Sequence, residues 1–568
     1  MRWSDGWRAR AESLCRPAVF SPLLFVLAVA VSIPFVDRGM IPNDEGALLT
    51  NAAKILRGEV FYRQIDAYPF PGAPYFLAFW MWLFGEQLAV ARWLAVGIFC
   101  CVVLSLYRVG LRLLDPKRAA LFGLSLLSLK LLAWPAFSAY TYSDLSFAFA
   151  CLAIALVVGH SYRGPSLRLV LAGVCVGLSV LSKQNLGLGI AAATTALLAV
   201  PGAPLRERGL GSRGSEIAAF LAGAALSIAP ALSYFAAQGV LAHAAHSGLV
   251  RPFTGYLPTS AISFLKPLAW WDLGELRDMS GFPYFVGPYW ALLTRGALPG
   301  ESWYPLYWTA GEILTRALYT SVPVVFLIAL ARWRHWTRRG SSDARELLAL
   351  SALALAALLS AFPRADFFHV VSVYAPVWLL LFGLLQRPEP RARAWRLQVC
   401  AVALLLVTAG TLASVYHAHL SHRLRLARAD LYVSPAYSWV GPVLDFVADQ
   451  VAPDEHIFVY GHEAYYYFLS GRYYPWPFCQ LYPGQAGGDD GRGLTELLER
   501  EPPRLVIRGI LNWPALPSIP RYAPRLHAHL AAHFAPDGRL RERLGRDDPP
   551  PGFLAVLRPR EAPPPSPR

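Results

Sequence analysis

The sequence predicts an α-helical polytopic membrane protein with about eleven transmembrane helices and a small extracytoplasmic α/β domain at its C-terminal end. Of its 568 residues, 55% are hydrophobic and 16% charged, and mean hydropathy is +0.38, which is too apolar for an ordinary soluble fold. About eleven apolar segments are long enough to cross a bilayer. Many of the 52 Lys and Arg residues lie in alternate short loops, so the net charge of +15 reflects the positive-inside pattern and does not indicate nucleic-acid binding.

The first predicted span follows a basic N-terminus, and the remaining spans follow at intervals that leave mostly short loops. They are expected at roughly 17–36, 88–113, 119–134, 143–160, 168–182, 185–201, 216–238, 305–331, 346–362, 368–386 and 397–415. The basic loops place the N-terminus in the cytoplasm, and an odd number of spans places the C-terminal region outside. The predicted location is therefore the inner (plasma) membrane, with many passes.

The domain organisation follows from these spans. We expect a cytoplasmic N-terminus (1–17), a membrane domain (18–415) with outer loops at 37–87 and 239–304, an extracytoplasmic α/β domain (416–558) and a disordered Pro-rich tail (559–568). The longer outer loop is rich in Trp, Tyr and Pro, which suits a segment half-embedded in lipid headgroups. Short apolar runs at 456–460, 504–508 and 553–557 predict strands, with a helix at 494–499.

Carboxylates at the outer ends of the spans are the first candidate site residues. Asp44 and Glu45 follow the first span and open an amphipathic segment, 45–57, where capping of a helix is an equal alternative. Asp144 lies at the outer start of another span, on the same membrane face. Asp66 and Tyr68 in the first outer loop are further candidates, although a loop carboxylate is usually only solvated. A carboxylate here can act as a general base or hold a divalent metal.

Cations in outer turns are the complementary candidates, because the positive-inside rule disfavours them there. Lys183 lies in one such turn, and Arg364 and His369 lie in another. Snorkelling, or a local pair between Arg364 and Asp366, would explain them without a function. The functional interpretation is a phosphate held between an Arg fork and a Lys point charge, as in a lipid-phosphate headgroup.

The order of these motifs resembles the GT-C superfamily of membrane glycosyltransferases, in its protein mannosyltransferase and aminoarabinose transferase branch (family 39-like, bacterial type). The likeness covers roughly residues 18–420. It rests on the acidic pair after the first span and on these segments: Tyr68-Pro-Phe-Pro-Gly-Ala-Pro-Tyr75, Phe84-Gly-Glu-Gln-Leu-Ala-Val-Ala-Arg92, Leu181-Ser-Lys183 and Arg364-x-Asp-x-x-His369.

The resemblance implies transfer of a hexosyl or pentosyl group from a polyprenyl-phosphate donor to a lipid, glycan or protein acceptor at the outer membrane face. By this likeness Asp44 is the base or acceptor-positioning residue, Asp144 a second acid, and Lys183, Arg364 and His369 neutralise the leaving phosphate. The 239–304 loop is too short for the inserted luminal domain of eukaryotic protein mannosyltransferases, which weighs against a protein acceptor. Membrane lipids are expected partners, nucleic acid is not, and a divalent metal is the one cofactor left open.

Other functions are compatible with part of this pattern. A flippase or transporter for a lipid-linked sugar would also place cations in an aqueous cavity, although the sequence has no paired repeats and few charges deep within spans. A lipid-linked oligosaccharide ligase or polymerase could use the outer Arg and His without needing the early acidic pair. A binding protein is the third alternative. No fixed-period repeat, Gly-rich phosphate loop or CxxC pattern is present.

Overall fold

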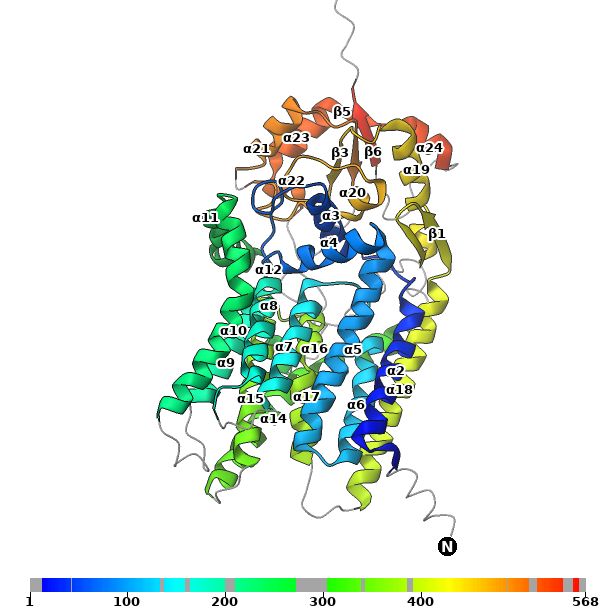
Figure 1. Ribbon diagram of the computed structural model, residues 1–568. Helices are drawn as coiled ribbons and strands as arrows, with labels where there is room; N and C mark the ends of the chain where they lie inside the picture. Colours follow the sequence, from blue (N-terminus) through cyan, green and yellow to red (C-terminus); the bar gives the residue numbers. More distant parts are fainter. Residues whose placement is uncertain are drawn as a thin grey trace, which may run out of the picture.

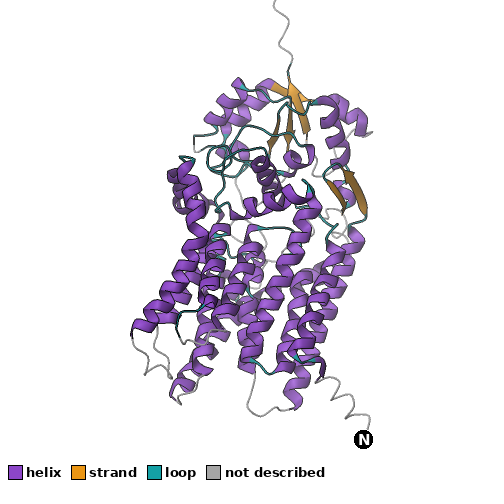
Figure 2. Ribbon diagram, viewed as in Figure 1, coloured by secondary structure: helices purple, strands orange, loops and turns teal. Residues whose placement is uncertain are grey.

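A computed structural model gives the architecture of the chain. It describes residues 13–41, 43–132, 137–158, 164–199, 210–271, 304–338, 343–385, 392–487, 489–509, 518–544 and 555–560. Figure 1 shows a bundle of long helices with a smaller domain at one end, and Figure 2 shows that the strands lie in that smaller domain.

The bundle helices coincide with the predicted apolar segments. They are α2 (Pro17–Ser32), α5 (Leu88–Leu113), α6 (Pro116–Leu132), α7 (Tyr142–Val158), α8 (Leu167–Ser182), α9 (Gln184–Ala199), α10 (Leu210–Ala237), α14 (Tyr304–Arg338), α15 (Asp343–Leu359), α16 (Phe367–Val373), α17 (Ala375–Leu385) and α18 (Ala392–His419). A short 3-10 turn, η1 (Ile33–Phe35), extends α2. Each predicted span therefore corresponds to a helix or, for α16 and α17, to a pair of helices.

Among the described residues, four helical stretches are long and apolar enough to cross a membrane: Pro17–Phe35, Leu88–Leu113, Arg213–Ala237 and Glu312–Arg338. The pair α16 and α17 adds a fifth if its 58° bend belongs to one span. The other bundle helices are apolar but shorter. The chain is therefore a multi-helix membrane protein, and the number of eleven spans stays a prediction.

Close helix packing in the bundle depends on glycine. A Cβ atom added at Gly173 of α8 would lie 1.9 Å from the carbonyl oxygen of Phe220, and one at Gly223 of α10 would lie 2.0 Å from that of Val170. Neither helix can carry a side chain at these positions without moving apart, so the glycines set the distance between α8 and α10.

Two helices lie between the bundle and the C-terminal domain: α3 (Asp44–Leu56) and α4 (Gly72–Phe84) (Figure 1). The apolar side chains of α3, such as Leu48 and Leu49, are buried against protein. The outer end of α4 differs, because Trp82 and Phe84 are 71% and 66% exposed. The aromatic rings at the end of this helix are therefore available to lipid headgroups.

The second outer loop begins with a series of short helical turns. These are α11 (Leu241–Ala245), the π-helical turns η3 (His246–Val250) and η4 (Pro252–Tyr256), α12 (Leu257–Ser260) and η5 (Lys266–Leu268). Trp271 is 88% exposed, as expected for an interfacial aromatic. The rest of the predicted aromatic loop, including Trp290 and Trp303, lies outside the described residues.

The C-terminal domain contains two small sheets. The first sheet is an antiparallel hairpin of β1 (His422–Leu426) and β2 (Ala429–Val433). The second sheet has the strand order β3-β4-β6-β5, and its strands β3 (Ile457–Tyr460) and β4 (Leu505–Arg508) are parallel. Strand β6 (Ala555–Pro559) is antiparallel to both of its neighbours, β4 and β5 (Phe534–Pro536). Its helical turns and helices are η6 (Pro435–Tyr437), α19 (Val440–Gln450), α20 (Tyr465–Ser470), α21 (Arg492–Arg500), α22 (Ile519–Tyr522), α23 (Pro524–His533) and α24 (Gly538–Leu544). The predicted strands and helix 494–499 are present; the hairpin, β5 and the other helices were not predicted.

Candidate active site

Asp44 is the first residue of α3, which lies between the helix bundle and the C-terminal domain (Figure 1). Its side chain is exposed, and within the described residues no hydrogen bond or ion pair reaches its carboxylate. Burial nevertheless raises the pKa of Asp44, while His369 and Arg364 lower it and Asp366 adds to the rise. Asp44 therefore lies within electrostatic range of Arg364 and His369.

Arg364 and His369 are held together by Asp366. Arg364 Nε lies 2.7 Å from Asp366 Oδ2, and His369 Nδ1 lies 2.7 Å from Asp366 Oδ1. Asp366 also caps α16 by accepting the His369 backbone N–H at 3.0 Å. Burial raises the pKa of Asp366, but His369 and Arg364 outweigh it and hold the pKa well below its usual range. Because a carboxylate only accepts, the His369 ring donates through Nδ1, and Nε2 is left for another partner.

Lys183 occupies the turn between α8 and α9 and is half-buried. No hydrogen bond or ion pair to its ammonium group occurs in the described part of the chain. Burial lowers the pKa of Lys183 to about 8, and the carboxylates of Asp144 and Asp366 oppose this change. Lys183 therefore shares the electrostatic environment of the Arg364 and His369 pair.

Asp144, in the first turn of α7, is only 2% exposed. Its Oδ2 accepts the backbone N–H of Phe137 at 3.0 Å, and Lys130 donates to the carbonyl of the same residue. Phe137 has a φ of 58°, in the left-handed region, so these two side chains hold an unfavourable backbone conformation through the N–H and the carbonyl of this residue. Asp144 is in electrostatic range of Lys183, but its carboxylate is hydrogen-bonded to the backbone of the Phe137 turn.

Glu45 is completely buried and differs from its neighbour Asp44. Its oxygens lie 2.7 and 2.8 Å from Arg92 of α5, and its Oε2 also accepts the Tyr465 hydroxyl at 3.0 Å. The backbone N–H of Tyr140 donates to Oε1 at 3.3 Å. Glu45 thus joins α3 to the bundle and to the C-terminal domain.

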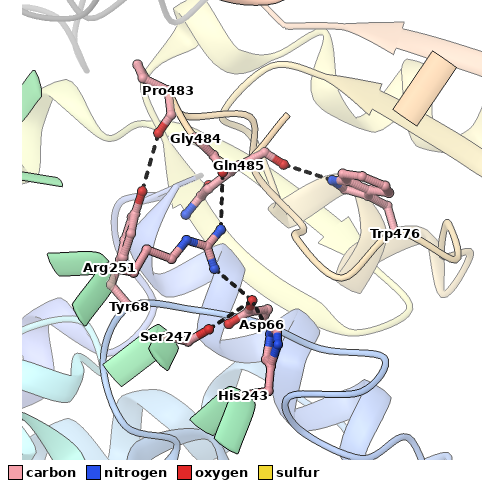
Figure 3. Close-up of polar contacts among 9 residues, drawn as sticks. All are labelled: Asp66, Tyr68, His243, Ser247, Arg251, Trp476, Pro483, Gly484 and Gln485. Atoms are coloured by element: carbon pink, nitrogen blue, oxygen red, sulfur yellow. Dashed lines mark hydrogen bonds and ion pairs between the residues drawn. The ribbon is translucent and has the colours of Figure 1, made fainter. Parts of the chain in front are cut away.

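Asp66 and Tyr68 belong to a separate polar cluster, shown in Figure 3. Asp66 is 7% exposed, so the solvated-loop alternative is wrong; its Oδ2 lies 2.7 Å from Arg251 and 3.1 Å from His243, and it accepts the Ser247 hydroxyl at 3.3 Å. Arg251 also donates to the Gly484 carbonyl and lies over the Tyr68 ring. The cluster fastens the second outer loop to the C-terminal domain.

Sequence reasoning missed Arg251 and Tyr465, which lie 185 and 420 positions from the carboxylates they contact. Asp366 was noted only as a local partner of Arg364; its spacing of three before His369 is the signal for its double role. Within the described residues no group of three or more His, Cys, Asp or Glu residues is placed to hold a metal ion, so the divalent metal left open above has no ligands assigned here.

Comparison with known proteins was made by sequence and by structure. Residues 68–236 match the family described as dolichyl-phosphate-mannose-protein mannosyltransferase. The match spans 169 of the 568 residues, less than a third of the chain, so this segment is similar to that family of mannosyltransferases. No curated protein sequence matches the chain directly.

Solved structures of other proteins are similar to this chain in fold. ArnT from Cupriavidus metallidurans in the apo state is 14% identical, with a TM-score of 0.55 over 95% of this chain and 98% of ArnT. The same protein bound to undecaprenyl phosphate is 14% identical, with a TM-score of 0.54, and the match covers 95% of this chain and 97% of ArnT. The Archaeoglobus fulgidus oligosaccharyltransferase tethered to an acceptor peptide is 12% identical, with a TM-score of 0.51, and the match covers 92% of this chain and 73% of the oligosaccharyltransferase. At these identities the likeness concerns the fold.

Proposed function

We propose that the protein transfers a sugar from a polyprenyl-phosphate donor to an acceptor hydroxyl at the extracytoplasmic membrane face. One observation carries the proposal: the accessible carboxylate of Asp44 lies in the electrostatic range of Arg364 and His369. A base and a set of cations within one site are what glycosyl transfer from a phosphate ester requires.

In the proposed reaction the acceptor oxygen attacks the anomeric carbon of the donor. The bond between that carbon and the phosphate oxygen breaks, and the phosphate leaves with the bonding electrons. Asp44 takes the proton of the acceptor hydroxyl, and Lys183, Arg364 and His369 stabilise the charge that develops on the leaving phosphate. Fixed cations are effective here because they need not reorganise as the charge forms.

The remaining carboxylates support the site in this proposal. Glu45 orients α3 through Arg92 and Tyr465, and Asp144 holds the Phe137 turn while its charge raises the affinity of Lys183 for a proton. Asp66 joins the first outer loop to the second through Arg251, and the Tyr68 hydroxyl joins the first outer loop to the C-terminal domain by donating to the Pro483 carbonyl. Asp44 is then the single base, which suffices for inversion at the anomeric centre.

The choice of donor is supported by the similarity in fold to ArnT, which has been solved with undecaprenyl phosphate bound. The acceptor has no such support, and lipid, glycan and protein hydroxyls all fit the chemistry. The C-terminal domain packs against α3, where a Cβ atom at Gly46 would lie 2.6 Å from the backbone nitrogen of Tyr465. Gly46 is two residues from Asp44, so we expect this domain to contact the acceptor.

The proposal is tested with purified protein in liposomes that contain a labelled polyprenyl-phosphate sugar. Glycosidic product with release of polyprenyl phosphate supports the transferase. Movement of intact donor across the bilayer without product would instead establish a flippase. Because the acceptor is open, the assay uses a crude cell-envelope lipid and glycan extract as acceptor, with water-only samples as the blank.

A further inference from the structure

The turn that carries Lys183 is fixed on two sides by the two side chains that follow it. Gln184 and Asn185 begin α9, and their amides reach different segments of the chain. Neither residue carries a charge, and neither has a place in the proposed chemistry. Their contacts nevertheless join the parts of the structure that supply the cations.

Asn185 connects this turn to the segment that leads to Arg364. Its Nδ2 donates to the carbonyl of Ser360 at 3.0 Å and to that of Phe362 at 3.2 Å. These carbonyls follow the end of α15 and would otherwise lack helical partners. Since Phe362 is two residues before Arg364, the Asn185 side chain fixes the start of the turn that carries the guanidinium.

Gln184 makes three bonds on the opposite side of the turn. Its Nε2 donates to the carbonyls of Tyr68 at 3.0 Å and Gly248 at 2.7 Å, and its Oε1 accepts the backbone N–H of Phe70 at 3.3 Å. It thereby connects the turn to both outer loops. The contact is tight, because a Cβ atom at Gly72 would lie 2.6 Å from the carbonyl oxygen of Leu181, just before Lys183.

The far side of the Arg364 turn is also held. The backbone N–H of Ile262 donates to the carbonyl of Pro363 at 2.9 Å, and that of Ala365 donates to Ile262 at 3.1 Å. The Tyr319 hydroxyl donates to the Ala365 carbonyl at 2.6 Å. Asn185 is thus the described side chain that links this braced turn directly to the Lys183 turn.

We propose that Gln184 and Asn185 are positioning residues that hold Lys183 and Arg364 at a fixed separation, matched to one phosphate group. The inference rests on the proposed function, in which these cations bind the donor phosphate. A phosphate bridges two cations only when their spacing fits its oxygens, so precise placement affects donor binding before it affects the chemical step.

The test compares Asn185→Ala and Gln184→Ala with Arg364→Ala in the full-length protein. We expect Asn185→Ala to raise the donor KM about tenfold, because a displaced guanidinium binds the phosphate less well, with kcat within about twofold. The double variant Asn185→Ala/Arg364→Ala should be little worse than Arg364→Ala alone, because Asn185 acts through that residue. Gln87→Ala is the control: its amide donates to the Ala427 carbonyl, outside the site, and donor KM should be unchanged.

Binding of undecaprenyl phosphate to the detergent-solubilised variants provides a measurement that does not require turnover. A wild-type protein that binds this lipid but transfers no sugar would refute the proposed function, and a weaker Kd in Asn185→Ala would still support the positioning role. Unchanged KM and Kd in both amide variants would overturn the inference. The inference would also be overturned if the effects of Asn185→Ala and Arg364→Ala on donor KM were additive in the double variant. A loss of donor binding that only follows a lower unfolding temperature would overturn it as well.

Discussion

Glu45 and Arg92 form a fully buried ion pair, with Glu45 Oε1 2.7 Å from Arg92 Nε and the two side chains 0% and 1% exposed. Arg92 also donates to the carbonyls of Arg38 and Gly39, and Glu45 accepts from Tyr465. A charge pair removed from water is stable only when its remaining hydrogen-bonding groups are satisfied, and these contacts satisfy them. The pair therefore fixes the first turn of α3, which begins with Asp44.

Removal of one partner should destabilise the protein strongly. Glu45→Gln leaves the Arg92 guanidinium buried without its counter-charge, and we expect a loss of about 3 kcal/mol or more in unfolding free energy. Thermal unfolding in detergent measures the change. The control is Asp430→Asn, which breaks an exposed pair with Arg423 and should cost about 1 kcal/mol or less. Equal shifts in the two variants would contradict a structural role for Glu45.

Asp44→Asn should behave in the opposite way. The Asp44 carboxylate has no hydrogen bond among the described residues, so its replacement should leave the unfolding temperature near that of the wild type. Sugar transfer should fall by about a hundredfold or more, because the amide cannot accept the acceptor proton. Asp37→Asn, an exposed carboxylate just after the first helix, is the matched control and should retain activity. Wild-type turnover by Asp44→Asn would remove it as the base.

Two groups with shifted pKa values should contribute to the pH dependence of the activity. Burial raises the pKa of Asp44, so the base is lost by protonation at a pH above that of an ordinary aspartate, which gives the acidic limb. Burial lowers the pKa of Lys183 to about 8, so its positive charge is present below this pH and lost above it, which gives an alkaline limb in donor KM.

Lys183→Arg separates these limbs, because a guanidinium stays charged throughout this range. The variant should abolish the alkaline rise in donor KM and leave the acidic limb of kcat/KM in place. Initial rates at saturating and at limiting donor concentration, measured from about pH 5 to about pH 10, resolve the acidic limb from the alkaline limb. An alkaline limb that persists in Lys183→Arg would belong to another group.

The sequence predicts the helices well because a long apolar segment is a local property. The start of α5 at Leu88 and the end of α8 at Ser182 agree with expectation to within a residue or so. The hairpin β1 and β2 was missed although its alternation is present: Leu424 and Leu431 are buried, while Arg423 and Arg425 on either side of Leu424 are exposed.

The site was predictable only as a set of residues on one membrane face. Asp44, Arg364 and His369 share an electrostatic environment in the structure, but their sequence positions could not reveal which carboxylates are already paired. The sequence around Asp66 predicts a solvated carboxylate, because its partner Arg251 follows 185 positions later and leaves no local signal. Glu45 resembled Asp44 because Tyr465 lies in a different domain. Partners brought together by folding leave no local pattern.

Asp366 offers a test in which simple charge counting and positioning predict opposite results. Asp366→Asn removes a negative charge beside Arg364 and His369, and charge alone would then strengthen binding of an anionic donor. We expect weaker binding instead, with donor KM raised about tenfold, because Asp366 orients both cations at 2.7 Å and an amide cannot pair with both in the same way.

Asp115 provides the matched control for this variant. It accepts the backbone N–H of Arg118 near the start of α6 and pairs with the Arg118 side chain at 2.6 Å. Asp366 likewise accepts a backbone N–H at the start of a helix, that of His369, and pairs with Arg364. Asp115, however, lies at the other end of the bundle. Asp115→Asn should therefore reproduce the stability cost of losing a cap, about 1 kcal/mol, without changing donor KM. If Asp366→Asn lowers donor KM, the cations act through their net charge and not through the geometry that Asp366 imposes.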